Sequence, residues 1–371
     1  MTWYPTLREP ESESATESSK KGCFRIFSTK LSVVPPTHLI QIQKAMSNVG
    51  QPHSSFIIRV PATSANIGPG FDVVGLSLSL HLTLTVTFVP TDGARVGPPV
   101  LEYTGEGADD VPLDPYKNLT TRVALYVLRC HDIQKFPTTV STSDGTTRTA
   151  QLKIAVDNEI PFGRGLGSSG AAVIAGVLLA NELGKLNLST SRILDFALMV
   201  ERHPDNVTAA LVGGFVGSYL RELDAAATEA ASVPLSEVLP EYPPDAGEEW
   251  GLNPPKPPIG IGHYVRFGWS ESIRAVAIIP RFELSTASAR QVLPESYSRK
   301  DLVRPLSSPL SFVLGSNRVF LQVFNLQRLA VLTTALAANP PDPELIYEAM
   351  KDRVHQPYRK ELVNSYTLFS S

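Results

Sequence analysis

The feature that most constrains the fold of this chain is a glycine-rich segment, 161–171, which reads Pro-Phe-Gly-Arg-Gly-Leu-Gly-Ser-Ser-Gly-Ala. It lies between a predicted strand at 152–156 and a predicted apolar helix at 168–183. The alternating glycines allow positive φ angles and a close approach of the backbone to a ligand. The helix would direct its unpaired N–H groups and its positive dipole end into the loop. The segment therefore predicts a strand, a ligand-binding loop and a buried helix in succession.

A loop of this kind attracts phosphate, and Ser168 and Ser169 add hydroxyls that can bind phosphate or a magnesium ion. The alternative is a glycine-rich turn with a serine N-cap. Three common glycine motifs do not fit. A Walker A loop would need Gly-Lys-Ser/Thr, a dinucleotide fingerprint would need glycine at position 168, and a nucleophile elbow would need glycine at position 171. We therefore predict a phosphate loop of another kind.

A second segment, 61–75, reads Pro-Ala-Thr-Ser-Ala-Asn-Ile-Gly-Pro-Gly-Phe-Asp-Val-Val-Gly. It is predicted to form a loop between two strands, because small and turn-forming residues dominate it. Asn66 and Asp72 are available there to hold a polar substrate. The alternative is a turn that these two side chains cap.

A third segment, 201–207, places polar or ionisable residues in five of its seven positions at the predicted end of a helix, as Glu-Arg-His-Pro-Asp-Asn-Val. Glu201 is a candidate magnesium ligand, and His203 and Asn206 are candidate substrate contacts. The alternative is an ordinary charged helix terminus followed by a turn.

Composition narrows the class of protein. The 371 residues are 43% hydrophobic and 19% charged, so the chain can bury a sizeable core. The net charge of −3 without a long basic run argues against nucleic acid as the main partner. The longest uncharged stretch, 73–91, alternates apolar and polar residues as a half-buried strand does, so no membrane span is expected. The two cysteines, Cys23 and Cys130, fit a reducing compartment, and Cys130 is expected to fill the core.

Two regions are not expected to carry chemistry. Residues 1–50 include a Ser/Glu-rich stretch and are predicted to be a disordered N-terminal extension. Residues 222–262 contain eight prolines between positions 234 and 258 and are predicted to be a Pro-rich surface insertion. The remaining predicted elements are strands at 56–60, from 73 to about 89, at 211–220 and at 273–279, and helices at 118–130, 191–202, 313–337 and from 344 to 353.

Together the three segments resemble the GHMP kinase superfamily. The loop 161–171 looks like its Pro-x-x-x-Gly-Leu-Gly-Ser-Ser motif, and Val-Pro-Ala-Thr-Ser-Ala-Asn-Ile-Gly-Pro-Gly-Phe-Asp at 60–72 and His-Pro-Asp-Asn-Val at 203–207 are closer still to the homoserine kinase family. The resemblance implies a two-domain α+β fold. It places a ribosomal protein S5 domain 2-like ATP-binding domain at 51–221 and a ferredoxin-like domain at 263–371.

The resemblance also implies an activity, which is transfer of the γ-phosphoryl group of ATP to the side-chain hydroxyl of L-homoserine. The product would be O-phospho-L-homoserine for threonine synthesis, with Mg²⁺ as the metal ion. It implies a cytoplasmic enzyme without nucleic-acid or membrane partners, and it leaves a homodimer open. Because an asparagine amide cannot accept a proton as a base, positioning is expected to matter more than base catalysis.

Roles are implied position by position. Asn206, Glu201 and Arg290 correspond to catalytic positions. The amino acid would be held by Asn66, Asp72, His203, Asn206, Arg290 and Arg359. The nucleotide would be held by Asn118, Pro161, Gly163, Arg164, Gly165, Leu166, Gly167, Ser168 and Ser169. Ser169 (or Ser168) with Glu201 would hold the magnesium ion.

One part of the family pattern is missing from the sequence. A glycine-rich Leu-Ser-Gly-Ala-Gly-Pro-Thr-like strand and loop is expected after Arg359, but the chain continues as Glu-Leu-Val-Asn-Ser-Tyr-Thr-Leu-Phe-Ser-Ser from residue 361. The C-terminal domain is therefore expected to be truncated. A catalytically impaired ATP-binding fragment or pseudoenzyme, and another GHMP kinase such as a mevalonate kinase, stay open as alternatives.

Overall fold

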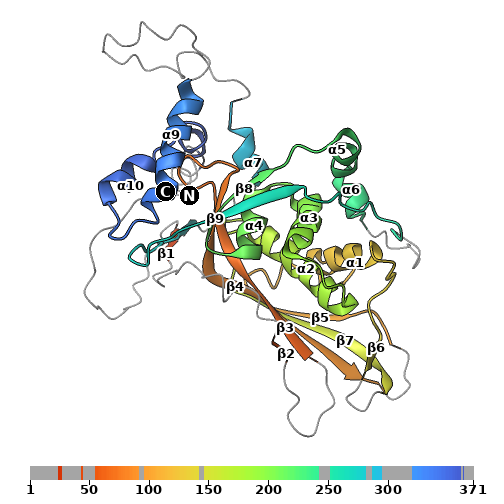
Figure 1. Cartoon of the computed structure of the whole chain (residues 1–371). Helices are drawn as coiled ribbons and strands as arrows, with labels where there is room; N and C mark the ends of the chain where they lie inside the picture. The colour runs from red at the N-terminus through yellow and green to blue at the C-terminus, as the bar shows by residue number, and fades with distance from the viewer. Residues whose placement is uncertain are drawn as a thin grey trace, which may run out of the picture.

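The computed structural model describes residues 55–91, 96–141, 146–241, 251–280, 286–294, 320–360 and 362, together with the backbone of two short strands at 24–26 and 43–44. Strands and helices are interleaved around a mixed sheet, so the predicted α+β class is confirmed (Figure 1). The division into two domains stays a prediction.

Two long antiparallel strands form the backbone of the sheet. Strand β3 (Ser55–Ala65) pairs with β4 (Val74–Pro90) along its whole length. The register shifts between Pro61 and Ala62, where β4 contains extra residues opposite the proline, which has no N–H to donate. Apolar side chains on one face, such as Ile58 and Leu84, are fully buried. The predicted strand at 56–60 is therefore confirmed but too short, since pairing continues to Ala65.

Strand β4 changes partners along its length. Its first residues pair with β8 (Phe215–Leu220), and its second half pairs with β7 (Thr147–Asn158). Strand β5 (Val100–Gly105) lies parallel to β7, β6 (Thr139–Ser141) pairs with the start of β7, and β9 (Gly262–Phe267) pairs with β8. The phosphate loop follows β7, so the sheet holds the start of this loop in place.

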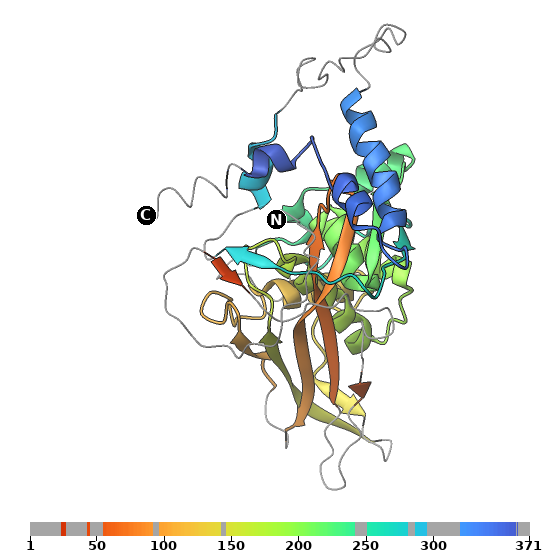
Figure 2. The ribbon, with the colours of Figure 1, turned by 90° about the vertical axis from the view of Figure 1, so that its left-hand side faces the viewer.

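Helices cover one face of the sheet (Figures 1 and 2). Helices α2 (Ser168–Gly184) and α4 (Pro204–Val212) pack directly on β3 and β4. Helix α3 (Thr190–Glu201) packs against α2 and α4, and α1 (Leu119–Arg129) packs on α2. Helix α2 is apolar on all sides and buried along most of its length, as a helix between a sheet and further helices must be. Cys130 lies buried after α1 as a free thiol, as predicted.

One predicted boundary is wrong. A helix at 191–202 and a strand at 211–220 are predicted, whereas the chain forms α4 between them and β8 begins only at Phe215. Pro204 at the first position of the helix explains the restart, because its fixed φ and missing N–H suit that position. Gly213, with a φ of 71°, ends the helix.

The C-terminal part supplies α7 (Thr286–Gln291), α9 (Phe320–Ala335) and α10 (Pro343–Ala349), with strand β10 (Ile278–Pro280) before them. The predicted strand at 273–279 and helices at 313–337 and 344–353 are found with different bounds, and residues 313–319 lie outside the described residues. In Figure 2, α9 stands above the helical layer.

The two regions without expected chemistry contact the fold. Strands β1 (Phe24–Ile26) and β2 (Gln43–Lys44) pair with β10 and β3, so these stretches of the predicted N-terminal extension are paired rather than disordered. The start of the predicted insertion forms α5 (Ala225–Ala231) and α6 (Leu235–Val238). Its residues 251–261 are bound by buried Asp195, which accepts N–H groups from Gly260 and Ile261. No helix in the described part of the chain is long and apolar enough to cross a membrane.

Candidate active site

The glycine-rich loop has the conformation that its sequence predicts. Gly163, Gly165 and Gly167 have φ angles of 61°, 75° and 67°, which side chains rarely adopt. The N-cap of α2 is Gly167, so the serine N-cap of the alternative interpretation is not present and no side chain caps the first N–H groups of the helix. Gly163, Gly165 and Ser169 are exposed, so the loop is open to a ligand. Pro161 and Leu166 are buried and anchor it.

The end of α3 and the start of α4 lie next to this loop. Ser169 Oγ donates to Glu201 Oε1 at 3.3 Å, which joins the two residues predicted to hold magnesium. Asn206, near the start of α4, accepts a hydrogen bond from the Thr63 hydroxyl at 2.7 Å through Oδ1. The backbone N–H of Thr63 donates to the Leu166 carbonyl at 3.0 Å. Three segments that are distant in sequence therefore meet at the phosphate loop.

Two carboxyl groups in this region have raised pKa values. Burial raises the pKa of Glu201, the hydrogen bond from Ser169 opposes the shift, and the nearby Asp205 adds to it. Burial also raises the pKa of Asp205, which is 1% exposed, whereas the N–H of Asn206 favours its ionised form. The charges of Asp72 and Arg290 act on Asp205 as well, so the phosphate-loop side and the substrate-loop side lie within electrostatic reach of each other.

The loop after β3 is the predicted substrate loop. Residues at its two ends have positive φ angles, which are strained for residues other than glycine. Asn66 and Asp72 have φ angles of 59° and 56°. Asn66 Oδ1 accepts the N–H of Asp72 at 2.9 Å, and the N–H of Asn66 donates to the Val74 carbonyl. The turn-capping interpretation is therefore correct for Asn66, and the Asp72 carboxylate remains free to meet another group.

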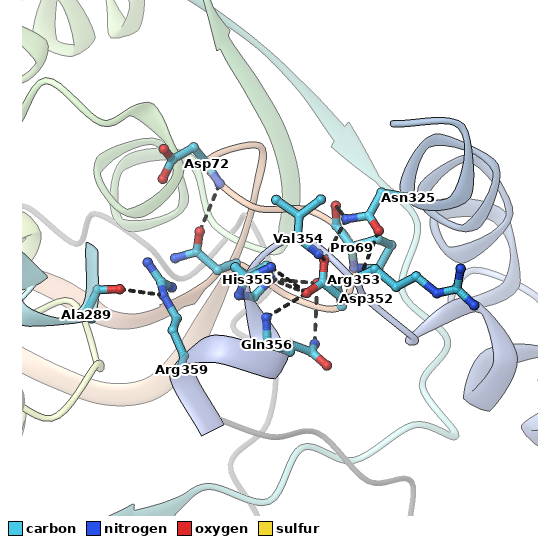
Figure 3. A network of polar contacts seen from close by, with 12 residues as sticks. Pro69, Asp72, Ala289, Asn325, Asp352, Arg353, Val354, His355, Gln356 and Arg359 are labelled. Atoms are coloured by element: carbon cyan, nitrogen blue, oxygen red, sulfur yellow. Dashed lines mark hydrogen bonds and ion pairs between the residues drawn. The ribbon is translucent and has the colours of Figure 1, made fainter. Parts of the chain in front are cut away.

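That group is an arginine from the C-terminal part. Arg290 Nη2 donates to Asp72 Oδ1 at 2.6 Å. Arg359 Nε donates to the carbonyl of Ala289 at 3.1 Å (Figure 3). Both guanidinium groups lie over the ring of Phe71, at 5.3 and 4.7 Å from its centroid. Burial and the neighbouring Arg290 cation lower the pKa of Arg359. Two arginines that converge in this way form a site suited to a carboxylate.

Asp352 connects Arg359 to the substrate loop. Its carboxylate accepts the N–H groups of Val354, His355 and Gln356 and the Nδ2 of Asn325, at 2.6 to 3.1 Å (Figure 3). These bonds cap the short helical segment 356–360 that carries Arg359.

The same cluster binds the carbonyl groups of the substrate loop. His355 Nε2 lies 2.9 Å from the Gly68 carbonyl, which also accepts a bond from Gln356, and Asn325 Nδ2 reaches the Pro69 carbonyl at 3.5 Å. The His355 ring stacks on Phe71, with 5.2 Å between the ring centroids. Residues from the C-terminal end of the described chain thereby fix a loop near its N-terminal end.

The structure brings some predicted residues together and separates others. His203 lies at the N-terminus of α4 and lines, with Asp72, a largely apolar cavity of about 460 Å³ bounded by β8 and β9. Asn118 instead caps α1, accepting from Thr120 and Thr121, and its Nδ2 donates to the Pro112 carbonyl. Its role as a nucleotide contact stays a prediction, because the amide is engaged within its own loop.

Four residues of this region were not predicted to act: Thr63, Phe71, Asp352 and His355. Asp352 lies inside the helix predicted from 344 to 353, so its role in capping the next helical segment, 356–360, was not visible in the sequence pattern. Thr63 and Phe71 lie within the 61–75 segment, but only the positions with ionisable or amide side chains were considered there. Their contacts depend on residues more than a hundred positions away.

The donors available for a metal are few. Among the residues that the structure describes, no group of three or more His, Cys, Asp or Glu side chains could hold a metal ion. Glu201 and Ser169 offer one carboxylate and one hydroxyl. That set fits Mg²⁺, which commonly takes one or two protein oxygens and completes its shell with phosphate and water.

Comparison with known proteins assigns the class. Residues 118–214, which include the phosphate loop and Asn206, match the family described as "GHMP kinases N terminal domain". The chain is 51% identical over 319 residues to the homoserine kinase of Saccharomyces cerevisiae, covering 84% of this chain and 80% of that protein. It is 47% identical over 308 residues to the homoserine kinase of Schizosaccharomyces pombe, covering 83% and 78%.

The solved structure of homoserine kinase from Cytophaga hutchinsonii shares the fold, with a TM-score of 0.53 at 21% identity over 85% of this chain and 77% of that one. The fold and the phosphate loop place the chain among the GHMP kinases, which use ATP as co-substrate. Within that class, the chain belongs to the homoserine kinase family. The predicted family and GHMP fold are confirmed.

Proposed function

We propose that this chain transfers the γ-phosphoryl group of ATP to the side-chain hydroxyl of L-homoserine, forming O-phospho-L-homoserine and ADP for threonine synthesis. Family membership supports the reaction. The observation that carries the proposal for this site is that the phosphate loop lies against Asn206, while the neighbouring Asp205 is within electrostatic reach of Arg290 and Arg359. The free, buried thiol of Cys130 is compatible with the reducing cytoplasm, which is the proposed location.

The phosphate loop binds the nucleotide in this proposal. The uncapped N–H groups at the start of α2 and the exposed backbone of Gly163 and Gly165 would hold the phosphates. Arg164, partly buried in the same loop, would add a positive charge. The proposed phosphoryl transfer does not depend on a strong general base, because positioning and charge stabilisation account for most of the catalysis in this kind of reaction.

The arginine pair binds the amino acid. The substrate carboxylate would lie between Arg290 and Arg359, and Asp72 would then face the ammonium group. Asn66 holds the loop in shape, and His203 borders the site. The substrate oxygen then bonds to the γ-phosphorus while the bond to the β,γ-bridging oxygen breaks toward ADP. The hydroxyl proton leaves to the transferred phosphate or to water.

Glu201 and Ser169 would hold Mg²⁺ together with the nucleotide phosphates. The ion would supply positive charge that balances the charge of the phosphates. The Ser169 hydroxyl of the phosphate loop donates to the Glu201 carboxylate and so positions that side chain.

The test is ADP release by the purified chain with ATP, Mg²⁺ and L-homoserine, with D-homoserine, L-serine and mevalonate as competing acceptors. L-Homoserine alone is expected to give sustained release. In Arg290→Ala the KM for homoserine should rise by at least about tenfold, since a charged hydrogen bond to the carboxylate is lost. Arg274→Ala, which removes an exposed arginine of the C-terminal part, is the matched control and should leave KM unchanged. ADP release that is as fast with mevalonate as with L-homoserine, or no ADP release with any acceptor, would reject the proposal.

A further inference from the structure

Thr63 connects the two halves of the site but has no place in the proposed chemistry. It lies in β3, its side chain is fully buried, and its backbone N–H binds the Leu166 carbonyl of the phosphate loop. A Cβ atom on Gly167 would come within 1.9 Å of the Thr63 hydroxyl oxygen. The hydroxyl therefore lies directly against the third loop glycine, at the point where α2 begins.

The hydroxyl has a second partner in Asn206. It donates to Oδ1 at 2.7 Å, and the Nδ2 of the same amide faces Asp205 Oδ1 at 3.4 Å. That carboxyl oxygen already accepts the backbone N–H of Asn206, so it acts as an acceptor on this side. The reversed amide would direct its oxygen at this acceptor and its NH₂ at Thr63. The acceptor on Asp205 thus selects this orientation of the amide, and the Thr63 hydroxyl holds the amide oxygen in place by donating to it.

We infer that Thr63 is a positioning residue, which holds the Asn206 amide with its oxygen toward β3 and its NH₂ group available to the substrate. The inference rests on the proposed function and gives Asn206 a defined chemical role. An amide held this way donates hydrogen bonds, so it stabilises negative charge on the reacting oxygens rather than accepting the hydroxyl proton. Among the described residues, Asp205 is the one acceptor of this NH₂ group, which leaves its second hydrogen for substrate.

The chain offers a matched control. Ser77 on β4 is also fully buried, and its hydroxyl also joins the sheet to α4, by donating to the Ala209 carbonyl at 2.7 Å. Replacing Ser77 with alanine removes a buried hydroxyl from the same sheet–helix interface without touching Asn206 or the loop. A decrease in kcat that Thr63→Ala and Ser77→Ala share therefore reports loss of packing and not loss of amide positioning.

The experiment compares Thr63→Ser with Thr63→Ala, which differ by one oxygen atom, and with Ser77→Ala. Thr63→Ala is expected to lower kcat by about tenfold or more, with KM for ATP changed less than about threefold, because one hydrogen bond is worth roughly that factor. Thr63→Ser should restore most of kcat. In an Asn206→Ala background, removing the Thr63 hydroxyl should have no further effect on kcat.

A substrate-free measurement separates this inference from the reaction itself. With ¹⁵N-labelled asparagine, the side-chain NH₂ signals of Asn206, identified by their absence in Asn206→Ala, should be a single sharp pair in the wild type. They should broaden or shift in Thr63→Ala but not in Ser77→Ala. Unchanged signals, or equal loss of kcat in Thr63→Ser and Thr63→Ala, would overturn the inference. If homoserine is not phosphorylated at all, the proposed function fails and the spectra still decide the role of Thr63.

Discussion

At the scale of single residues, Glu201 combines a proposed magnesium-binding role with an environment that disfavours its charge. Burial raises its pKa, so the folded state binds the Glu201 proton more tightly than the unfolded chain does. Its contribution to stability is therefore present at acid pH and is lost as the pH rises through the folded-state pKa. An ionised carboxylate kept in such surroundings is typical of a functional site.

Glu201→Gln is expected to abolish most activity at pH 7 and to leave the free energy of unfolding at that pH equal to or above that of the wild type. The reason is that glutamine keeps the shape but has no charge to desolvate or to offer to Mg²⁺. Steady-state kinetics across Mg²⁺ concentrations and urea unfolding measure the two effects. A variant that loses stability at pH 7 while keeping its Mg²⁺ dependence would contradict this assignment.

Gly167 and Gly165 differ in surroundings although both have positive φ angles. Gly167→Ala places a methyl group within 1.9 Å of the Thr63 hydroxyl oxygen, whereas a Cβ on Gly165 meets nothing within 4 Å. Gly167→Ala should therefore lower ATP affinity by more than about tenfold, and Gly165→Ala should show only the smaller penalty of its backbone angle, about 1 kcal/mol. Titration with a fluorescent ATP analogue measures the affinity of both variants. A similar loss of affinity in the two would show that the contact with Thr63 does not determine the effect of Gly167→Ala.

At the scale of elements, the Asp352 cluster acts as a clamp on the substrate loop. One carboxylate organises the segment that carries Arg359, and the same segment binds the carbonyl of Gly68. Asp352→Ala should raise the KM for homoserine by more than about tenfold while ATP binding changes little, since the phosphate loop is formed by other elements. Stability should fall by roughly 2–4 kcal/mol, because several buried donors lose their acceptor.

Asp342→Ala is the matched control for Asp352→Ala. Asp342 also caps a helix, accepting the N–H groups of Glu344 and Leu345 at α10, but it is exposed and these two hydrogen bonds stay within α10. Its loss should lower stability by about 1 kcal/mol and leave KM unchanged. A rise in KM in both variants would assign the effect of Asp352 to general loosening of the C-terminal helices.

Much of the N-terminal part could be predicted because its signals are local. Period-two alternation identified β4, and a continuous apolar run identified α2. The restart of the chain as α4 was missed because residues 201–207 were interpreted as the end of the preceding helix. The contacts of Thr63 and Phe71 could not be predicted, since a single β-branched or aromatic residue in a segment predicted as a loop gives no pattern that indicates its partner. The site residues taken from the family resemblance still await the experiments above.

At the scale of the whole molecule, two buried histidines make stability depend on pH. Burial is the main cause that lowers the pKa of both His81 and His355 below 6.5. The unfolded chain therefore binds more protons between the folded-state pKa and 6.5, so stability is fully present above that range and is lost as the pH falls through it.

The free energy of unfolding should accordingly decrease between pH 7 and pH 5, and His355→Gln should make that decrease shallower. Urea unfolding at half-unit steps of pH measures the slope. The exposed His263→Gln variant serves as control and should keep the wild-type slope. A slope that is the same in His355→Gln and in the wild type would show that His355 does not contribute to it.

The contacts that define the site also determine when it can form. The pairing of β3 with β4 joins neighbours in the chain, whereas Thr63 and Asn206 are 143 residues apart, Asp72 and Arg290 are 218 apart, and Gly68 and His355 are 287 apart. Contacts that close long loops are expected late in folding. During synthesis the sheet and phosphate loop can assemble long before residue 355 leaves the ribosome. A nascent chain would thus acquire nucleotide binding first and amino-acid binding last.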